Sequence, residues 1–261
     1  MDLRNILNDF TSGSLSLSEA EKQLSIHAIE KLGDIAKLDV GRELRRGVPE
    51  IIFAESKEYS DLKRIALAAI GRNGQVVVSR IRRNHLARFA AALKKKGILV
   101  EVGRNSTTLL AVAKSFRRKM TAAKIGIMAA GTSDVGVAEE ARLVAKAMGC
   151  ESIASYDIGI AGMHRLFPAL KEMIGQGVGA IAVVAGMEGA LASVVASMVD
   201  VPVVGVPTSV GYGFGGNGVA ALASMLQSCT LGLAVVNIDN GVAAGAYAAS
   251  IAKKKEIPNK S

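Results

Sequence analysis

The sequence has few of the residues that mark a disulfide-rich or aromatic-cored protein. Among its 261 residues it has only two cysteines, no tryptophan and 4% aromatic residues. Two cysteines cannot form a disulfide framework, so we expect reduced thiols and a cytoplasmic location. The amino-terminal segment also lacks a basic region followed by an apolar run, so it gives no sign of secretion. A sandwich of two sheets around an aromatic core is disfavoured as well.

Lysine and arginine are absent between Lys171 and Lys253. A stretch with so little charge could belong to a membrane protein. Glu188, Asp200 and Asp239 interrupt it, however, and glycines recur in it, so that no run of about 18 apolar residues remains. We therefore expect buried strands and helices in this stretch, and no membrane partner.

Positive charge is concentrated in the first half of the chain. Residues 1–124 hold 24 of the 32 Lys and Arg residues but 13 of the 23 Asp and Glu residues, in a chain of net charge +9. A nucleotide-binding or RNA-binding module is one interpretation of this half. Its aromatic residues between positions 50 and 120 are scattered rather than interleaved with the basic ones: Phe53, Tyr59, Phe89 and Phe116. A solvated or substrate-facing surface is the simpler interpretation, and we expect no nucleic-acid partner.

From residue 124 onward, an apolar run and a helical pattern alternate five times. The apolar runs are KIGIMAA, SIASYDI, GAIAVVA, VPVVGVP and LGLAVVNI. Continuous apolar strands joined by helices predict an α/β domain whose parallel sheet is covered on both faces. In such sheets a ligand lies beyond the carboxyl ends of the strands. The five loops that follow the strands are therefore where we expect the functional residues.

The first 121 residues have a different pattern, which predicts a smaller basic α/β domain. Its expected strands are EIIFAE, QVVVSRI and ILVEV. In the segment SLSLSEAEKQL, Ser18 is the expected N-cap of a helix because Glu21 follows three residues later. We place the domain boundary in the charged segment SFRRKMTAAK, which gives domains of residues 1–121 and 122–261.

A loop of small polar residues, Gly131 to Asp134, lies between the first strand of the repeat and its helix. A helix amino terminus offers free N–H groups and a partial positive charge, which suit a phosphate. The hydroxyls of Thr132 and Ser133 would add donors. The alternative is that Ser133 or Asp134 only caps the helix.

Further polar candidates lie in the later loops. Glu188 follows the third strand among apolar and glycine neighbours, where a carboxylate can act as a general base; alternatively it only complements the dipole of the next helix. Asp157, His164 and Arg165 follow the second strand on the same expected rim, although a lone histidine is more often structural. The segment PTSVGYGFGGNG, which includes Asn217, is either a nucleotide-binding loop or an ordinary flexible loop.

The two cysteines differ in their sequence context. Cys229 is expected to close an apolar helix, where it is either a small buried hydrophobic residue or a nucleophile that needs a nearby cation. Cys150 precedes a strand and has no such partner, so we expect a structural role. No cluster of histidine and cysteine has the spacing of metal ligands.

Several of these motifs together resemble one family. GTSD, SYDIGIAGMHR, VAGMEGALASVVA, VPVVGVPTSVGYG, MLQSC, AVVNIDNG and LDVGRELRRGVPEIIFAESK are similar to the synthase of pyridinium-3,5-biscarboxylic acid mononucleotide, which begins the assembly of the nickel pincer cofactor. The carboxyl-terminal half also resembles phosphoribosylaminoimidazole carboxylase of purine synthesis. The resemblance implies a flavodoxin-like three-layer domain and a homo-octamer. Where related sequences often read GYGASFGG, this chain has GYGFGGNG.

The resemblance also implies a reaction and residue roles. The substrates would be nicotinic acid adenine dinucleotide and CO2 or bicarbonate. The pyridinium ring would be carboxylated at C5 and the phosphoanhydride hydrolysed, which gives the biscarboxylic mononucleotide and AMP. Cys229 would add to the ring, and Glu188 would remove the C5 proton. The other candidates would contact the substrate: Thr132, Ser133, Asp134, Asp157, His164, Arg165 and Asn217.

Cleavage of the phosphoanhydride creates negative charge, for which we expect Mg2+ and no organic cofactor. Asp134 or Asp157 would contact the metal ion.

The purine enzyme is the rival interpretation. It carries a histidine in the stretch AGGAAHLPGM, whereas residues 185–194 here read AGMEGALASV. Alanine therefore stands where that histidine would be, and no proline follows it. Without this proton shuttle, purine carboxylation is disfavoured.

Overall fold

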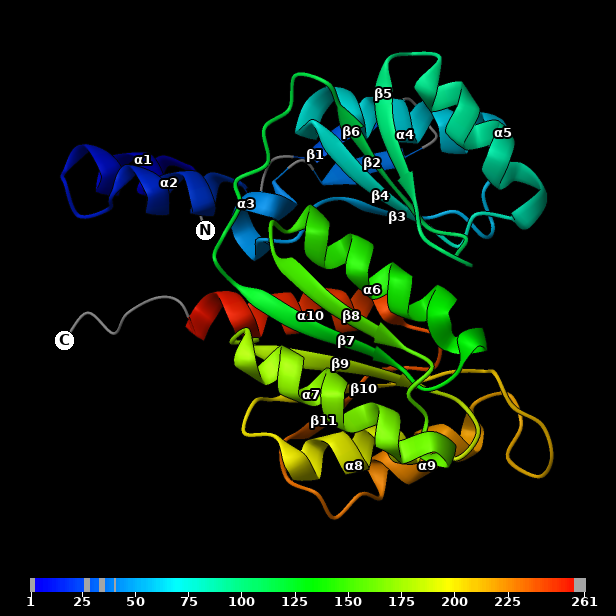
Figure 1. The fold of residues 1–261 in the computed structure, drawn as a ribbon. Helices are drawn as coiled ribbons and strands as arrows, with labels where there is room; N and C mark the ends of the chain where they lie inside the picture. Colours follow the sequence, from blue (N-terminus) through cyan, green and yellow to red (C-terminus); the bar gives the residue numbers. More distant parts are fainter. Residues whose placement is uncertain (1–2, 26–28, 33–35, 40, 256–261) are drawn as a thin grey trace. The chain divides into compact units, whose positions relative to one another are not determined.

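A computed structural model describes residues 3–25, 29–32, 36–39 and 41–255 (Figure 1). Its internal contacts divide the chain into two units. The amino-terminal unit comprises Met1–Val100 and Leu110–Phe116, and the carboxyl-terminal unit comprises Glu101–Leu109 and Arg117–Ser261. The domain boundary at residues 121 and 122 stays a prediction.

The carboxyl-terminal unit is built on a parallel sheet of five strands. These strands are β7 (Lys124–Ala129), β8 (Glu151–Tyr156), β9 (Ala180–Ala185), β10 (Val203–Pro207) and β11 (Leu233–Val235). Their order is β11-β10-β9-β7-β8, so the chain reverses direction across the sheet between β7 and β9. This is the flavodoxin order, and it confirms the expected fold class.

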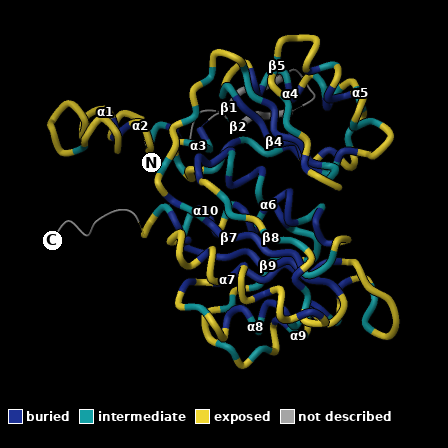
Figure 2. The backbone as a smooth tube through the Cα atoms, viewed as in Figure 1, coloured by how far each residue is buried: buried dark blue, intermediate teal, exposed yellow. Residues whose placement is uncertain are grey.

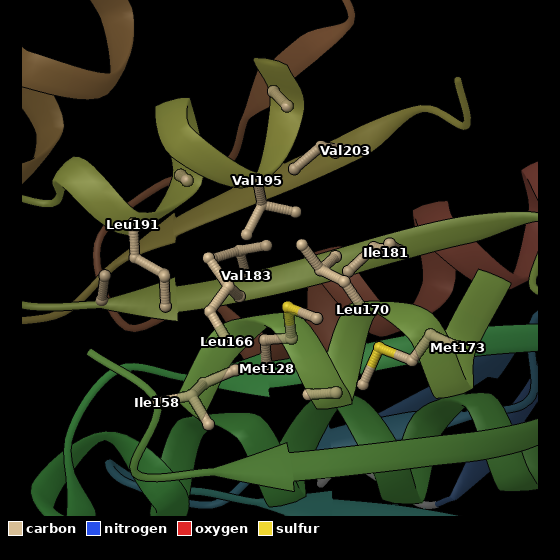
Figure 3. Close-up of a cluster of buried hydrophobic side chains, with 14 of the residues drawn as sticks. Met128, Ile158, Leu166, Leu170, Met173, Ile181, Val183, Leu191, Val195 and Val203 are labelled. Atoms are coloured by element: carbon tan, nitrogen blue, oxygen red, sulfur yellow. The ribbon is translucent and has the colours of Figure 1, made fainter. Parts of the chain in front are cut away.

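Three helices cover one face of this sheet: α7 (Leu166–Gly175), α8 (Ala190–Met198) and α9 (Val219–Leu226). They bury a continuous apolar cluster against the strands, as Figure 3 shows. Met128 and Val183 from the sheet meet Leu166 from α7 and Val195 from α8, and all four side chains are fully excluded from water. Strands buried on both faces explain why the apolar runs are continuous rather than alternating.

The opposite face is covered by α6 (Val135–Ala147) and α10 (Gly241–Lys255). These two helices approach each other closely because α10 carries glycine where it meets α6. A Cβ at Gly241 would overlap the carbonyl oxygen of Val137, and one at Gly245 would overlap that of Ala141. The two glycines therefore allow the close approach of the two helices.

The amino-terminal unit contains a four-stranded sheet of order β3-β4-β6-β5. Its strands are β3 (Ile51–Phe53), β4 (Gln75–Ser79), β5 (Ile98–Val102) and β6 (Leu109–Ala113), with the long helices α4 (Tyr59–Asn73) and α5 (Arg83–Lys94). The remaining elements are α1 (Leu3–Thr11), α2 (Leu17–Leu24), α3 (Arg42–Arg46) and the antiparallel pair β1 (Ile29–Leu32) and β2 (Ala36–Asp39). The expected smaller α/β domain is thus observed.

The N-cap predicted for α2 is wrong by two residues. Ser16, not Ser18, caps the helix: its Oγ accepts a hydrogen bond from the N–H of Glu19, whose carboxylate accepts one from the N–H of Ser16 at 2.9 Å. The sequence offers the Ser-x-x-Glu pattern at both registers. The earlier one is used, and it lets Leu17 and Ser18 enter the first turn.

Nearly all residues of the central strands β7, β9 and β10 are buried, as Figure 2 shows. Within the described ranges, no helix has both the length and the apolar character needed to cross a bilayer.

Candidate functional site

A cavity of about 360 Å³ opens at the carboxyl ends of the strands of the carboxyl-terminal unit. Its lining comes from the loops after β7, β8, β9 and β10, so it lies at the point where the strand order reverses. That is where open α/β sheets bind ligands. Several predicted residues line it: Thr132, Ser133, Asp134, Asp157 and Glu188.

The loop after β7 contributes both exposed and buried residues to the cavity lining. Thr132 and Ser133 lie in a short 3-10 turn at the start of α6, and both are exposed. Asp134 is only 4% exposed. Its Oδ2 accepts a hydrogen bond from the N–H of Gly131 at 2.8 Å, and its Oδ1 accepts one from the hydroxyl of Thr208 at 2.6 Å.

Asp134 therefore ties the loop after β7 to the loop after β10. Burial raises the pKa of its carboxyl above the usual range, while the hydrogen bonds from Thr208 and from the backbone of Gly131 and Gly186 act in the opposite direction. The exposed hydroxyl residues of this loop, Thr132 and Ser133, are thus followed by a carboxylate that is buried and hydrogen-bonded within the protein.

Two lining residues have left-handed backbone conformations. Met187 has φ 52° and Asp157 has φ 61°. The conformation of Met187 is held because its N–H bonds to the carbonyl of Val210 at 3.0 Å, and the adjacent Gly186 leaves no room for a Cβ beside that carbonyl. Strained backbone of this kind persists only where its surroundings fix it, and it is concentrated at functional sites.

Glu188 and Ala190 line the same wall of the cavity. Glu188 is exposed, in the turn between β9 and α8. Ala190, the first residue of α8, also lines the cavity, and its methyl group cannot carry a proton. The ionisable side chain at this part of the lining is therefore a carboxylate, two residues before the position where the purine enzyme has its histidine.

The loop after β8 contributes an ion pair at the rim. Nη1 of Arg165 donates to Oδ2 of Asp157 at 2.5 Å, and both side chains are more than one-third exposed. His164 is exposed and does not line the cavity. Of these three residues only Asp157 lines the cavity; Arg165 reaches it through its ion pair with Asp157, and His164 does not.

The glycine-rich loop after β10 reaches away from the cavity. Asn217 has φ 57° and is exposed, but only Val210 of this loop lines the cavity. Tyr212 and Phe214 are almost completely exposed, at 83% and 111% of their reference areas.

Cys229 lies near the amino ends of the strands, at the edge of the sheet opposite to the cavity. Helix α9 ends at Leu226, three residues earlier than the predicted end, so Cys229 falls in the loop before β11 and is exposed rather than buried. In that loop the carbonyl of Gly232 accepts a hydrogen bond from Val203, the first residue of β10. Glu188 instead follows the carboxyl end of β9, a six-residue strand that is roughly 17 Å long at ~3.3 Å per residue. Within one chain, the structure does not bring the two predicted catalytic residues together.

The donor set does not fit a protein-bound Mg2+ ion. Both carboxylate oxygens of Asp134 already accept hydrogen bonds, and Asp157 is paired with Arg165. Across the described ranges, no three His, Cys, Asp or Glu side chains are grouped so that they could hold a metal ion. A requirement for Mg2+ stays a prediction.

Sequence reasoning missed two contributors to the site. Thr208 is completely buried and holds Asp134, and Val210 holds Met187 through its carbonyl oxygen. The only sequence signal for Thr208 is a hydroxyl residue directly after a strand, where a polar side chain needs a partner.

Comparison with known proteins agrees with this architecture. Residues 124–260 match the family described as AIR carboxylase, and residues 29–111 match the LarB/PurE-like N-terminal domain. The chain is also 44% identical over 255 residues to the uncharacterized protein MJ0165 of Methanocaldococcus jannaschii, an alignment that covers 97% of each chain.

Proposed function

Because the chain belongs to the AIR carboxylase family and carries a LarB/PurE-like N-terminal domain, we propose that it carboxylates the pyridinium ring of nicotinic acid adenine dinucleotide at C5. In the same proposal it hydrolyses the phosphoanhydride of this dinucleotide, releasing pyridinium-3,5-biscarboxylic acid mononucleotide and AMP. The family supports a carboxylase-type function; the pyridinium substrate and the hydrolysis are our inference.

One observation carries the choice of substrate. Glu188 and Ala190 line one cavity, so the wall holds a carboxylate and no imidazole. Carboxylation of an aminoimidazole in the purine enzyme relies on the histidine that Ala190 replaces. A pyridinium carboxylation needs only a base for the C5 proton and a nucleophile for the ring.

The proposed chemistry makes an electron-poor ring into a carbon nucleophile. The thiolate of Cys229 adds to C4, forming a C–S bond, and the cationic ring becomes a neutral dihydropyridine. C5 now has enamine character and forms a C–C bond to CO2, which restores positive charge to the ring nitrogen. Glu188 takes the proton from C5, the C–S bond breaks, and the thiolate leaves as the ring regains aromaticity.

The phosphate end of the substrate is assigned to the loop after β7. Thr132 and Ser133 are exposed at the start of α6, where N–H groups and the helix dipole favour a phosphate. Arg165, at the rim, adds a positive charge. Water attack on one phosphorus of the anhydride then separates AMP from the mononucleotide.

The position of Cys229 adds a condition to this proposal. Since Cys229 is exposed at the far end of the sheet from Glu188, the thiolate that meets the cavity comes from another copy of the chain. We therefore include a homo-oligomer, an octamer by resemblance, in the proposed function. Such an assembly would cover Tyr212 and Phe214, the exposed aromatic side chains of the loop after β10.

The direct test incubates the purified protein with the dinucleotide and 13C-bicarbonate, with and without Mg2+, and follows the products by mass spectrometry. We expect a labelled biscarboxylic mononucleotide and AMP, and an adduct on Cys229 when the reaction is trapped. Cys229→Ala and Glu188→Gln should each lose at least about 100-fold in kcat, whereas Cys150→Ala, which changes the buried cysteine, should keep its activity.

Three outcomes would reject the proposal. Unlabelled pyridine product, or full activity in Cys229→Ala, would remove the mechanism. Turnover of aminoimidazole ribotide in place of the dinucleotide would assign the chain to purine synthesis.

A further inference from the structure

A second cavity, of about 350 Å³, lies in the amino-terminal unit and plays no part in the proposed function. Helices α4 and α5, with the C-cap of α5, supply its lining: Tyr59, Lys63, Arg88, Ala91, Ala92 and Lys95. Its volume falls in the range of small-ligand sites.

The spacing of the lining residues explains the hollow. Arg88, Ala91, Ala92 and Lys95 follow one another at positions i, i+3, i+4 and i+7, so they share one face of α5 and its C-cap. The two alanines form a low floor between two long basic side chains. On α4, Tyr59 and Lys63 are four residues apart and share the facing side.

Three positive charges surround this floor without a compensating carboxylate. No acidic residue is part of the lining. In the portion of the chain that the structure describes, neither an ion pair nor a side-chain hydrogen bond engages Lys63, Arg88 or Lys95. Like charges that line one hollow repel each other, and an anion that enters it relieves that repulsion.

Tyr59, the aromatic residue of this cavity, already contacts three neighbouring side chains. The guanidinium carbon of Arg88 lies 4.6 Å from the centroid of the Tyr59 ring. The rings of His85 and Phe89 meet Tyr59 edge to face at 5.5 and 6.2 Å. Because Arg88 lies over the Tyr59 ring, the ring serves to hold this guanidinium in place, and the ligand is recognised by its charge.

We propose that this cavity, defined by Lys63, Arg88 and Lys95, is a binding site for a small anion with two or more phosphate groups. Arg88 gives a planar fork of donors to one phosphate, and the two lysines serve as mobile point charges for its neighbours. The inference does not depend on the proposed carboxylation, because none of its residues belongs to the carboxyl-terminal unit.

Isothermal titration of the full chain with inorganic triphosphate tests the proposal. Lys63→Gln/Lys95→Gln removes two charges from the cavity and should weaken binding at least about tenfold. The matched control is Lys94→Gln/Lys96→Gln, which removes the same charge from two exposed residues beside Lys95 that do not line the cavity. The control should bind within about twofold of the wild type.

A third variant tests the shape of the cavity independently of its charge. Ala91→Leu fills the floor without changing any charge, and leucine is well accepted in a helix. It should abolish triphosphate binding while the far-ultraviolet circular dichroism stays that of the wild type. ATP should bind with about the same affinity as triphosphate, because Arg88 already lies over the Tyr59 ring and the ligand is recognised by its charge.

Three results would overturn the proposal. Equal weakening in the two double-lysine variants would indicate a diffuse basic surface. Unchanged binding in Ala91→Leu would place the anion outside the cavity. Single-stranded RNA that binds with a steep salt dependence and displaces triphosphate from the wild type would make this face an RNA surface instead.

Discussion

Thr208 donates a hydrogen bond from its hydroxyl to Oδ1 of Asp134 at 2.6 Å, and both residues are buried. The bond spans 74 residues of sequence and joins the loop after β10 to the loop after β7. Asp134 lines the cavity together with Thr132 and Ser133, whereas Thr208 does not. The shape of the loop after β7 therefore depends on a residue that does not itself line the cavity.

Thr208→Val should destabilise the carboxyl-terminal unit and distort this loop. Valine keeps the shape of threonine but leaves one buried oxygen of Asp134 without its donor, which costs about 1–3 kcal/mol. Chemical denaturation measures the loss in free energy of unfolding. Thr208→Ser is the matched control because it keeps the hydroxyl, so equal losses in the two variants would show that packing rather than the hydrogen bond is responsible.

Gly186→Ala should be much more harmful than its small size suggests. A Cβ at this position would overlap the carbonyl oxygen of Val210 and lie 2.7 Å from the hydroxyl of Thr208. The turn that carries Glu188 would have to move, at a cost of about 1–3 kcal/mol in stability. Thermal unfolding and the activity assay report the two effects separately.

Gly175→Ala provides the comparison for this variant. Gly175 ends α7, and nothing lies within 4 Å of its added Cβ. This substitution should be neutral or slightly stabilising, because alanine restricts the unfolded chain. If Gly186→Ala were as well tolerated, the close approach of the two loops would be wrong.

Acid should weaken the carboxyl-terminal unit through Glu139. Burial by itself raises the pKa of this carboxyl, but hydrogen bonds from Arg142, Tyr156 and the N–H of Arg104 outweigh it and hold the pKa below its usual value. A depressed pKa stabilises the fold at pH values above the unfolded pKa of about 4.3, and this stabilisation is lost as the pH falls through the lower folded value.

Denaturation between pH 7 and pH 3 tests this dependence. Glu139→Gln should lose about 1–3 kcal/mol at neutral pH and show a flatter decline toward acid than the wild type. Glu172→Gln, which changes an exposed carboxylate on α7, should follow the wild-type curve. Parallel curves for wild type and Glu139→Gln would assign the acid sensitivity to another group.

The parallel sheet could be predicted from the sequence because its strands are buried on both faces. All six residues of β9 are buried, so the run GAIAVVA has no alternation to misread. The last strand is shorter than predicted: LGLAVVNI suggested residues 231–238, whereas β11 covers Leu233–Val235. This strand forms the edge of the sheet. Its flanking residues Gly232 and Val236 still bond to β10, so backbone pairing continues beyond the three residues of regular strand.

The site was predictable only in part, because contacts over long sequence distances have no local pattern. The loop order identified residues such as Thr132 and Glu188 as lining candidates, since parallel strands end at one edge. Nothing local indicates that Thr208 meets Asp134, or that Tyr59 meets Arg88 across two helices. The position of Cys229 follows from the direction of α9, which runs from the cavity edge back to the opposite edge.

Arg165→Gln should change substrate affinity and leave stability nearly unchanged. Its ion pair with Asp157 is largely exposed, and exposed pairs contribute only about 0–1 kcal/mol. Loss of a positive charge at the rim should raise KM for the dinucleotide several-fold with little effect on kcat. Lys171→Gln removes an exposed charge farther along α7 and should leave KM unchanged. A drop in kcat without a change in KM would instead place Arg165 in the chemical step.

Mixed assemblies can show whether Cys229 and Glu188 act from different copies. Cys229→Ala and Glu188→Gln should each be inactive alone. Co-expressed in equal amounts and isolated through two different tags, they form oligomers in which half of the subunits keep each residue. If a site takes Glu188 from one subunit and Cys229 from another, about one quarter of the sites are intact in a random mixture, so about one quarter of wild-type activity should return. A chain that used both residues from the same copy would regain none, because no single subunit in the mixture carries the intact pair. The separation of the two residues within one chain makes the first result the expected one.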